Sequence, residues 1–356
     1  MANMMQVLNT ILAQGSEMYQ SRVPQATKDN LSAVGTAIMS AKVIENEFLT
    51  SLVEKVAMTI VHNKTFHNPL AIFKKGKLPM GRNLEEIYTN PVTGQLFDPS
   101  GKDLLTAASP DVKAIYHTRN RQGKYTAKIS KSQLISAFTS YQALEKLLNQ
   151  IVTSIYSGDN LEEMMLMKEL FSTGIEGGKI KSVDFTGGDV STTEGAKNLV
   201  KLIKTIGLNM TEPSSAYNSY YDINHEKDPK PAITWTPMES QILVLRNDVA
   251  VNIDMELLAN AYNTSYAEMK QRIVTVANFG SNTRCGAVLC DEALVQVYDN
   301  LEQMENFHNG DGLFDKWMYH HWQTYSLSLF ANAMAFMLPE PTEGTSVEDE
   351  QPEPTE

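Results

Sequence analysis

The stretch from residue 130 to residue 171 constrains the fold most, because its apolar residues repeat at helical spacing over a long distance. A helix from Lys131 to Tyr156 would be about 39 Å long at about 1.5 Å per residue, which suits a plate-like subunit. Residues 157–160, with the sequence SGDN, offer a glycine and then a new N-cap, so we expect a second helix to begin at Leu161. The stripe consists of Leu134, Phe138, Tyr141, Leu144, Leu148, Ile151 and Ile155.

The composition predicts a globular protein. The chain has 356 residues, of which 42% are hydrophobic, enough for a sizeable core or for two to three lobes. It contains no run of about 18 apolar residues and no signal-peptide pattern at its N-terminus, so we expect no membrane contact and synthesis in a cytoplasm. Cys285 and Cys290 are too few for a disulfide framework and lack the His of a zinc pattern, which predicts buried thiols.

The charge of the chain is unevenly distributed. The formal net charge is −12, and residues 339–356 hold seven acidic side chains and no basic one. This segment also has four prolines and no aromatic residue, so we expect it to be disordered. Residues 64–128, in contrast, contain eleven Lys and Arg against five Asp and Glu. A basic segment in an acidic protein indicates a contact surface, for nucleic acid or for an acidic face of another copy.

Residues 61–129 interrupt the helical periodicity with many turn-forming residues. Asn-Pro pairs and glycines recur there among apolar residues such as Phe73, Ile87 and Tyr116, a pattern typical of an irregular β-hairpin excursion. Loops longer than about 15 residues are usually functional or disordered, and the apolar residues argue against disorder. We therefore expect the excursion to be stabilised by lying on a neighbouring subunit.

The remaining segments predict an α+β protein. An amphipathic helix over residues 48–60 should follow a partly extended N-terminal arm. Residues 193–287 should form one α/β lobe, after which residues 287–297 and 317–338 return to a core beside the central helix. Within this part we expect strands at 180–185, 241–246 and 272–279 and helices at 193–206, ending at Gly207, at 255–260 and at 266–271.

The chain lacks the motifs of well-defined catalytic chemistry. It contains no P-loop, nucleophile elbow, zinc-protease helix or paired C-x-x-C. His320 and His321 adjoin aromatic residues and point in different directions, which favours a packed aromatic helix over a chelating pair. Residues 309–312, with the sequence NGDG, lack the ligands of a calcium loop and indicate a turn. We therefore expect no enzyme activity, no cofactor and no metal.

Several short strings stand out across roughly residues 20–337. They are Asn68-Pro69-Leu70, Phe73-Lys74-Lys75-Gly76, Pro79-x-Gly81-Arg82, Glu85-Glu86-Ile87-Tyr88-Thr89, Arg119-Asn120-Arg121-Gln122-Gly123, Tyr298-Asp299-Asn300-Leu301, Met304-Glu305, Trp322-Gln323-Thr324 and Phe330-Ala331-Asn332-Ala333. In this order they resemble the major capsid proteins of phi-29-like podophages. The resemblance implies a Hong-Kong-97-type capsid fold and a virion protein that assembles in the host cytoplasm.

This family implies a subdomain plan and a set of partners. The partners are many copies of the chain in pentamers and hexamers, a scaffolding protein, a portal or connector, and packaged double-stranded DNA. The family's immunoglobulin-like extra domain is not matched here, so its functions are not expected. The plan has an N-terminal arm and helix at 1–60, an E-loop at 61–129, a P-domain at 130–192 with the spine helix in 130–156, an A-domain at 193–287, a P-domain return at 288–338 and the acidic tail at 339–356.

Two alternatives stay open at this point. An encapsulin-like nanocompartment has the same fold, and a DNA-binding protein would use the basic segment. For a shell protein, we expect salt bridges between subunits from that segment, no covalent cross-links, and an acidic tail on the outer surface, away from the DNA. The residues expected at these contacts are Lys74, Lys75, Arg82, Arg119 and Arg121 as donors and Glu85 and Glu86 as acceptors.

Overall fold

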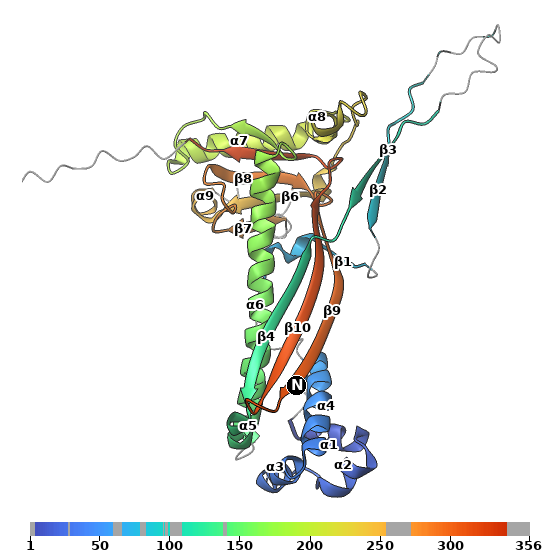
Figure 1. Cartoon of the computed structure of the whole chain (residues 1–356). Helices are drawn as coiled ribbons and strands as arrows, with labels where there is room; N and C mark the ends of the chain where they lie inside the picture. The colour runs from blue at the N-terminus through green and yellow to red at the C-terminus, as the bar shows by residue number, and fades with distance from the viewer. Residues whose placement is uncertain are drawn as a thin grey trace, which may run out of the picture.

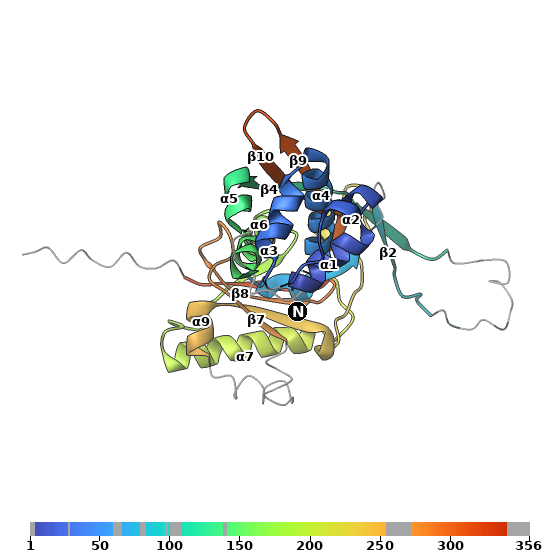
Figure 2. The ribbon, with the colours of Figure 1, turned by 90° about the horizontal axis from the view of Figure 1, so that it is seen from below.

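A computed structural model describes most of the chain, and a single long helix, α6 (Tyr141–Glu176), runs along it (Figure 1). One sheet lies beside each half of α6, and the N-terminal helices pack at the end where α6 begins (Figures 1 and 2). No helix in the described part is both long and apolar enough to cross a membrane. The described residues are 4–27, 29–59, 66–78, 83–94, 96, 99, 109–137, 141–253 and 272–339.

A four-stranded sheet packs against the first half of α6. Trp317 and Tyr319 point from its centre into a core that includes Ile151 and Ile155 of α6. Four N-terminal helices complete this core: α1 (Met4–Gln14), α2 (Glu17–Arg22), α3 (Leu31–Met39) and α4 (Lys42–Thr59), with α5 (Lys131–Ala137) beside them. The sheet has the order β1 (Lys74–Lys77), β9 (Val295–Asn309), β10 (Phe314–Leu327) and β4 (Arg121–Ser130), and only the β1–β9 pair is parallel.

A five-stranded sheet packs against the second half of α6. Its strand β6 (Gln241–Arg246) is buried on both faces. Val244 packs toward Met167 and Phe171 of α6, and Leu243 packs toward Leu199 of helix α7 (Thr193–Asn209). The sheet order is β5 (Lys181–Asp184), β11 (Ala333–Met337), β8 (Cys285–Asp291), β6 (Gln241–Arg246) and β7 (Ile273–Val276). The surrounding helices are α7 (Thr193–Asn209), α8 (Tyr220–Asn224), α9 (Asn247–Asn252), η2 (Pro69–Phe73) and η3 (Met238–Ser240).

A third, two-stranded sheet extends away from this body (Figure 1). It pairs β2 (Leu84–Thr89) with β3 (Val112–His117) in antiparallel register. The sequence groups residues 61–129 as one excursion, but β1 and β4, near its two ends, lie in the four-stranded sheet. The described part that stands apart is therefore the β2–β3 hairpin.

The predicted break after Tyr156 is wrong, because α6 continues through residues 157–160. Asp159 does not cap a new helix: its carboxylate is buried and ion-paired. Gly158 keeps φ negative and lies beside the ring of Tyr125, so it is an interior helical residue. The helix predicted from Lys131 also differs, because α5 and α6 are separate elements; Phe138 lies outside the described residues.

The predicted aromatic helix around His320 and His321 is also wrong, because residues 314–327 form strand β10. Trp317, Tyr319 and His321 are buried, and the residues between them are partly exposed, which is the two-residue period of a strand. Large side chains occupy both faces of β10, so the sequence hides this alternation. The two histidines do point in different directions, as expected.

Other local predictions are confirmed. The strands expected at 180–185 and 241–246 are β5 and β6, and the strand expected at 272–279 is the shorter β7. The helix from Thr193 continues past Gly207 to Asn209. Cys285 and Cys290 are buried free thiols, and the turn between β9 and β10 consists of residues 310–313, so it includes three of the four residues expected at 309–312. The predicted helices at 255–260 and 266–271, and the tail beyond residue 339, lie outside the described residues.

Candidate assembly site

A buried network of charged side chains joins α6 to all four strands of the four-stranded sheet. Three anions, Asp159, Glu163 and Asp299, alternate with three cations, Lys74, Arg121 and His321. Asp159 and Glu163 lie one helical turn apart on α6 and therefore face the sheet together. The cations come from β1, β4 and β10, and Asp299 from β9.

The contacts form a continuous chain across the sheet. Arg121 Nη2 lies 3.0 Å from Asp159 Oδ1, and Asp159 Oδ2 lies 2.7 Å from Nδ1 of His321. The other imidazole nitrogen, Nε2, lies 2.9 Å from Asp299 Oδ1. Lys74 Nζ lies 3.1 Å from the same Asp299 oxygen and 2.9 Å from Glu163 Oε2. Each buried charge thus touches at least one opposite charge, the condition under which buried ions are tolerated.

The pKa shifts of the network follow from these contacts. Burial by itself would lower the pKa of His321, but the hydrogen bonds and charges of Asp159 and Asp299 raise it to about 9. Burial would raise the pKa of Asp299, yet the hydrogen bond from His321 and the charge of Lys74 hold it well below its usual range. His321 is therefore an imidazolium at neutral pH that donates from both nitrogens.

Glu163, Asp299 and His321 also have the donor atoms of a possible metal site, since these atoms lie within 4.8 Å of one another. The Lys74 ammonium already bridges the two carboxylates, and the side-chain amide of Gln323 donates to both, at 2.9 Å and 2.7 Å. The doubly protonated imidazole has no lone pair for a metal. These residues fit an internal salt-bridge network, and we assign no metal to them.

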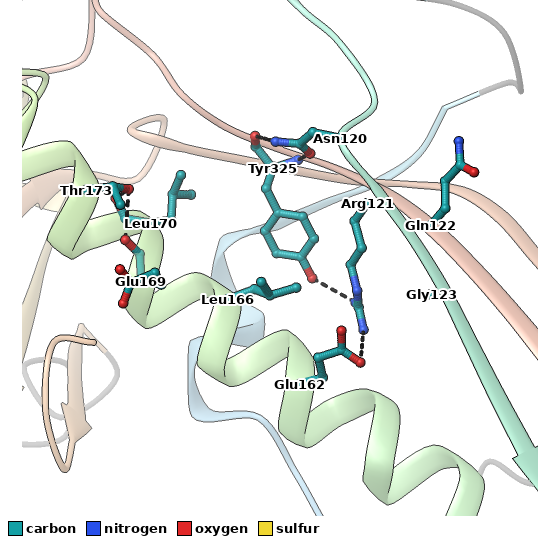
Figure 3. A pocket seen from close by; sticks show the side chains of 10 residues that line it. All are labelled: Asn120, Arg121, Gln122, Gly123, Glu162, Leu166, Glu169, Leu170, Thr173 and Tyr325. Atoms are coloured by element: carbon teal, nitrogen blue, oxygen red, sulfur yellow. Dashed lines mark hydrogen bonds and ion pairs between the residues drawn. The ribbon is translucent and has the colours of Figure 1, made fainter. Parts of the chain in front are cut away.

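A groove lies beside the network, between the start of β4 and the outer side of α6 (Figure 3). Its cavity has a volume of about 410 Å³, and Leu166, Leu170 and Tyr325 provide its apolar surface. The guanidinium of Arg121 borders it, and the buried Nε of that side chain has no hydrogen-bond partner in the described structure. Its charged lining residues are Arg121, Glu162 and Glu169.

The β2–β3 hairpin is fixed to the body by the inner of its two faces. The ammonium of Lys113 is fully buried, 2.5 Å from Asp228 Oδ2, and lies over the ring of Tyr220. Tyr88 stacks on Phe330 with ring centroids 5.3 Å apart, and His117 Nδ1 lies 2.5 Å from Ser326 Oγ. These contacts fix the hairpin's inner face.

The described residues expected at subunit contacts lie at several places within the subunit and already make contacts there. Lys74 and Arg121 are engaged inside the subunit by the buried network. The Lys75 ammonium donates to the Glu292 carbonyl, and Arg119 stacks over the Trp322 ring at 4.6 Å. The carboxylate of Glu85 accepts from Tyr116, that of Glu86 pairs with His117, and Arg82 lies outside the described residues.

Sequence reasoning missed four residues of the network: Asp159, Glu163, Asp299 and His321. One signal was available. Asp159 and Glu163 follow Ile155 at steps of four, so a continued apolar stripe places both carboxylates on the buried face of the helix. A carboxylate on a buried stripe requires a cationic partner. The sequence does not identify these partners, because Arg121, Lys74 and His321 lie 38, 89 and 162 positions away from the carboxylates they pair with.

The family model and the relatives that match this sequence are all phage major capsid proteins. The model of the Phi29-like phage major capsid protein family matches residues 8–337. The major capsid protein of Bacillus phage PZA is 31% identical over 333 residues, covering 93% of this chain and 72% of the relative. That of Streptococcus phage Cp-1 is 26% identical over 338 residues, covering 92% of each chain.

Solved structures from phages share the fold at low sequence identity. The capsid structure of Staphylococcus phage Andhra has a TM-score of 0.62 at 11% identity, covering 78% of this chain and 86% of the other. A chain from native bacteriophage P68 has a TM-score of 0.57 at 11% identity, covering 78% of this chain and 86% of the other.

The fold is a mixed α/β phage capsid fold of the Hong-Kong-97-like type. The protein is a structural component of the virion and not an enzyme. The chain belongs to the family of Phi29-like phage major capsid proteins.

Proposed function

We propose that copies of this chain form the closed head shell of a tailed phage by self-association, and that the outward face of the β2–β3 hairpin is one of the contacts between copies. The observation that carries this proposal is the exposure of apolar side chains on that face. Ile87, Val112 and Tyr116 are 60%, 57% and 66% exposed. Contiguous exposed apolar residues on a fixed element are typical of protein interfaces.

The two faces of the hairpin differ because strand side chains alternate. Glu85 lies opposite Tyr116, and Thr89 lies opposite Val112, so these residues share the outward face. The inward face carries Lys113 and His117, which the body of the subunit already binds. A neighbouring copy would therefore meet an apolar surface whose orientation is set by buried contacts.

The subdomain plan of the family extends this proposal. The β2–β3 hairpin corresponds to the E-loop, α6 to the spine helix, the four-stranded sheet to the P-domain and the five-stranded sheet to the A-domain. A scaffolding protein, a portal and packaged double-stranded DNA are the further partners that we propose. Covalent cross-links between copies form no part of it. The proposed intersubunit contacts remain Lys74, Lys75, Arg82, Glu85, Glu86, Arg119 and Arg121. The ion pairs that Lys74 and Arg121 make within the subunit would be additional to these contacts.

The experiment compares the substitution Val112→Asp with the matched control Val251→Asp, which changes an even more exposed valine on α9. Burial of a valine side chain stabilises a contact by about 1.5–3 kcal/mol, and the contact repeats around a shell. We expect Val112→Asp subunits to fold but to form no shells by sedimentation and negative-stain imaging, and Val251→Asp subunits to assemble normally. Normal shells from Val112→Asp would refute the proposed contact.

A further inference from the structure

The four-stranded sheet has one face that no described element covers. α6 and the N-terminal helices pack on the face that bears Trp317 and Tyr319. The opposite face bears the side chains between them along β10 and β4, which are partly or fully exposed. In the strand register His320 lies opposite Lys124, and Lys316 lies opposite Lys128.

This uncovered face is mainly basic: Lys124, Lys128 and Lys316 lie on it, with one carboxylate, that of Glu305, opposite Met318. Lys124, Lys128 and Lys316 form no ion pair within the described part of the chain. Lys128 instead lies 4.2 Å from the centroid of the Phe314 ring, and Arg119 extends the positive surface beyond Trp322. Like charges that face each other across two strands destabilise a sheet, so Lys128 and Lys316 gain from an anionic partner.

We propose that this basic face binds the acidic C-terminal segment, residues 339–356, of a neighbouring copy in the shell. The inference rests on the proposed shell assembly. The segment holds seven carboxylates and no basic residue, the charge that the sheet face lacks. It cannot form a core of its own, and a strip of lysines offers contacts along an extended chain. Each copy supplies one segment and one face, so the two are present in equal number.

The distances favour a neighbouring copy over the same copy. The segment follows β11, which belongs to the sheet beside the second half of α6, whereas Lys128 and Lys316 lie near α5 at the opposite end (Figure 1). The 36 residues of α6 span about 54 Å at about 1.5 Å per residue. A fully extended segment of 18 residues reaches about 60 Å, so its own sheet face would require nearly complete extension.

The first experiment couples carboxylates to lysines with a zero-length carbodiimide in assembled shells made from equal amounts of ¹⁴N and ¹⁵N chains. We expect peptides that join residues 340–356 to Lys124, Lys128 or Lys316, with mixed isotopes in the joined pairs. Pairs of one isotope only would place the segment on its own copy and overturn the proposal. Coupling of the segment to the exposed Lys197 and Lys201 of α7 instead would also overturn it.

The second experiment measures how fast a Glu-specific protease removes the segment from shells. Reversal of two weak ion pairs in Lys124→Glu/Lys128→Glu should raise the cleavage rate by roughly tenfold at low salt. The control Lys197→Glu/Lys201→Glu should leave the rate unchanged. Equal rates in both variants would contradict the proposal.

A third comparison separates the acidic segment from packaged DNA as the occupant of the basic face. Chemical modification of Lys124 and Lys128 should be equally slow in filled and emptied shells and faster in shells of chains ending at residue 338. Protection that depends on DNA would assign the face to DNA and refute the proposal. A failure of the wild-type chain to form shells would count against the proposed function, whereas intact shells without these effects would count against this inference alone.

Discussion

The imidazole of His321 on β10 lies 2.7 Å from the carboxylate of Asp159 on α6, so a buried ion pair joins the central strand to the long helix. Both side chains are almost fully buried. Asp299 contacts the other nitrogen of the same imidazole. The position of α6 on the sheet therefore depends on charge compensation as well as on apolar packing.

Removal of this imidazole should destabilise the subunit strongly. In His321→Ala, Asp159 and Asp299 lose a shared cation while they remain buried, and breaking a buried pair costs about 3–5 kcal/mol. Urea unfolding of the unassembled subunit measures the loss. The adjacent control His320→Ala removes a partly exposed imidazole and should change the stability by about 0.5 kcal/mol or less. Equal effects of the two substitutions would contradict the network.

The free energy of unfolding of the subunit should also depend on pH, and the pKa shifts of His321 and Asp299 determine the direction of each contribution. The folded-state pKa of His321, about 9, is higher than its unfolded value of 6.5. The protonated side chain therefore adds fully to the free energy of unfolding below about pH 6.5, and this contribution is lost as the pH rises through 9. The shift corresponds to about 3 kcal/mol, at about 1.4 kcal/mol per pKa unit. The lowered pKa of Asp299 acts in the opposite direction: its contribution is present above about pH 4 and is lost in acid.

The measurement is urea unfolding of the wild-type subunit and of His321→Gln at pH 6, 8 and 10. We expect the difference in unfolding free energy between the two proteins to be largest at pH 6 and to shrink toward pH 10. A difference of the same size at all three pH values would show that His321 does not carry the charge.

Because α6 is continuous through Gly158, the change in stability on replacing this glycine by alanine has a predicted direction. Gly in a helix interior is destabilising by about 0.5–1 kcal/mol relative to Ala, and a Cβ at Gly158 would meet the Tyr125 ring at 3.7 Å, an ordinary contact. Gly158→Ala should therefore stabilise the subunit by that amount. Destabilisation would instead indicate the C-terminal glycine of a broken helix. Gly178, with φ of +69°, is the matched control, since alanine there should destabilise.

The buried ammonium of Lys113 should control the order of the hairpin. Lys113→Met keeps much of the volume but leaves Asp228 without its ion-pair partner and removes the contact with Tyr220. We expect faster hydrogen exchange at residues 84–89 and 112–117 and unchanged exchange in the five-stranded sheet. Exchange that rises equally in both regions would mean that Lys113 stabilises the whole fold rather than the hairpin.

The sequence was sufficient for elements with one dominant pattern. The apolar stripe predicts the helical part of α6 up to Tyr156, although not its continuation to Glu176, and the apolar β-branched run at 241–246 predicts the buried strand β6. The family resemblance gave the fold class. Strand β10 was mistaken for a helix because aromatic, sulfur and imidazole side chains occupy both of its faces. The two-residue alternation becomes visible only through burial.

The sequence could not predict the buried network for a different reason. Its members are charged residues that usually lie on surfaces, and its pairings join positions such as Asp159 and His321 that are far apart in the chain. The expectation that Arg121 and Lys74 serve contacts between copies followed from local charge alone. Tertiary structure supplies both with partners inside the subunit.

An electron-microscopic reconstruction of purified assemblies would show whether copies of this chain form a closed shell through the outward face of the β2–β3 hairpin. We predict closed shells in which Ile87, Val112 and Tyr116 are buried against a neighbouring copy and in which each chain migrates as a monomer of about 40 kDa on denaturing electrophoresis. Shells in which this face remains open to solvent, or the absence of shells from the wild-type chain, would refute the proposed assembly.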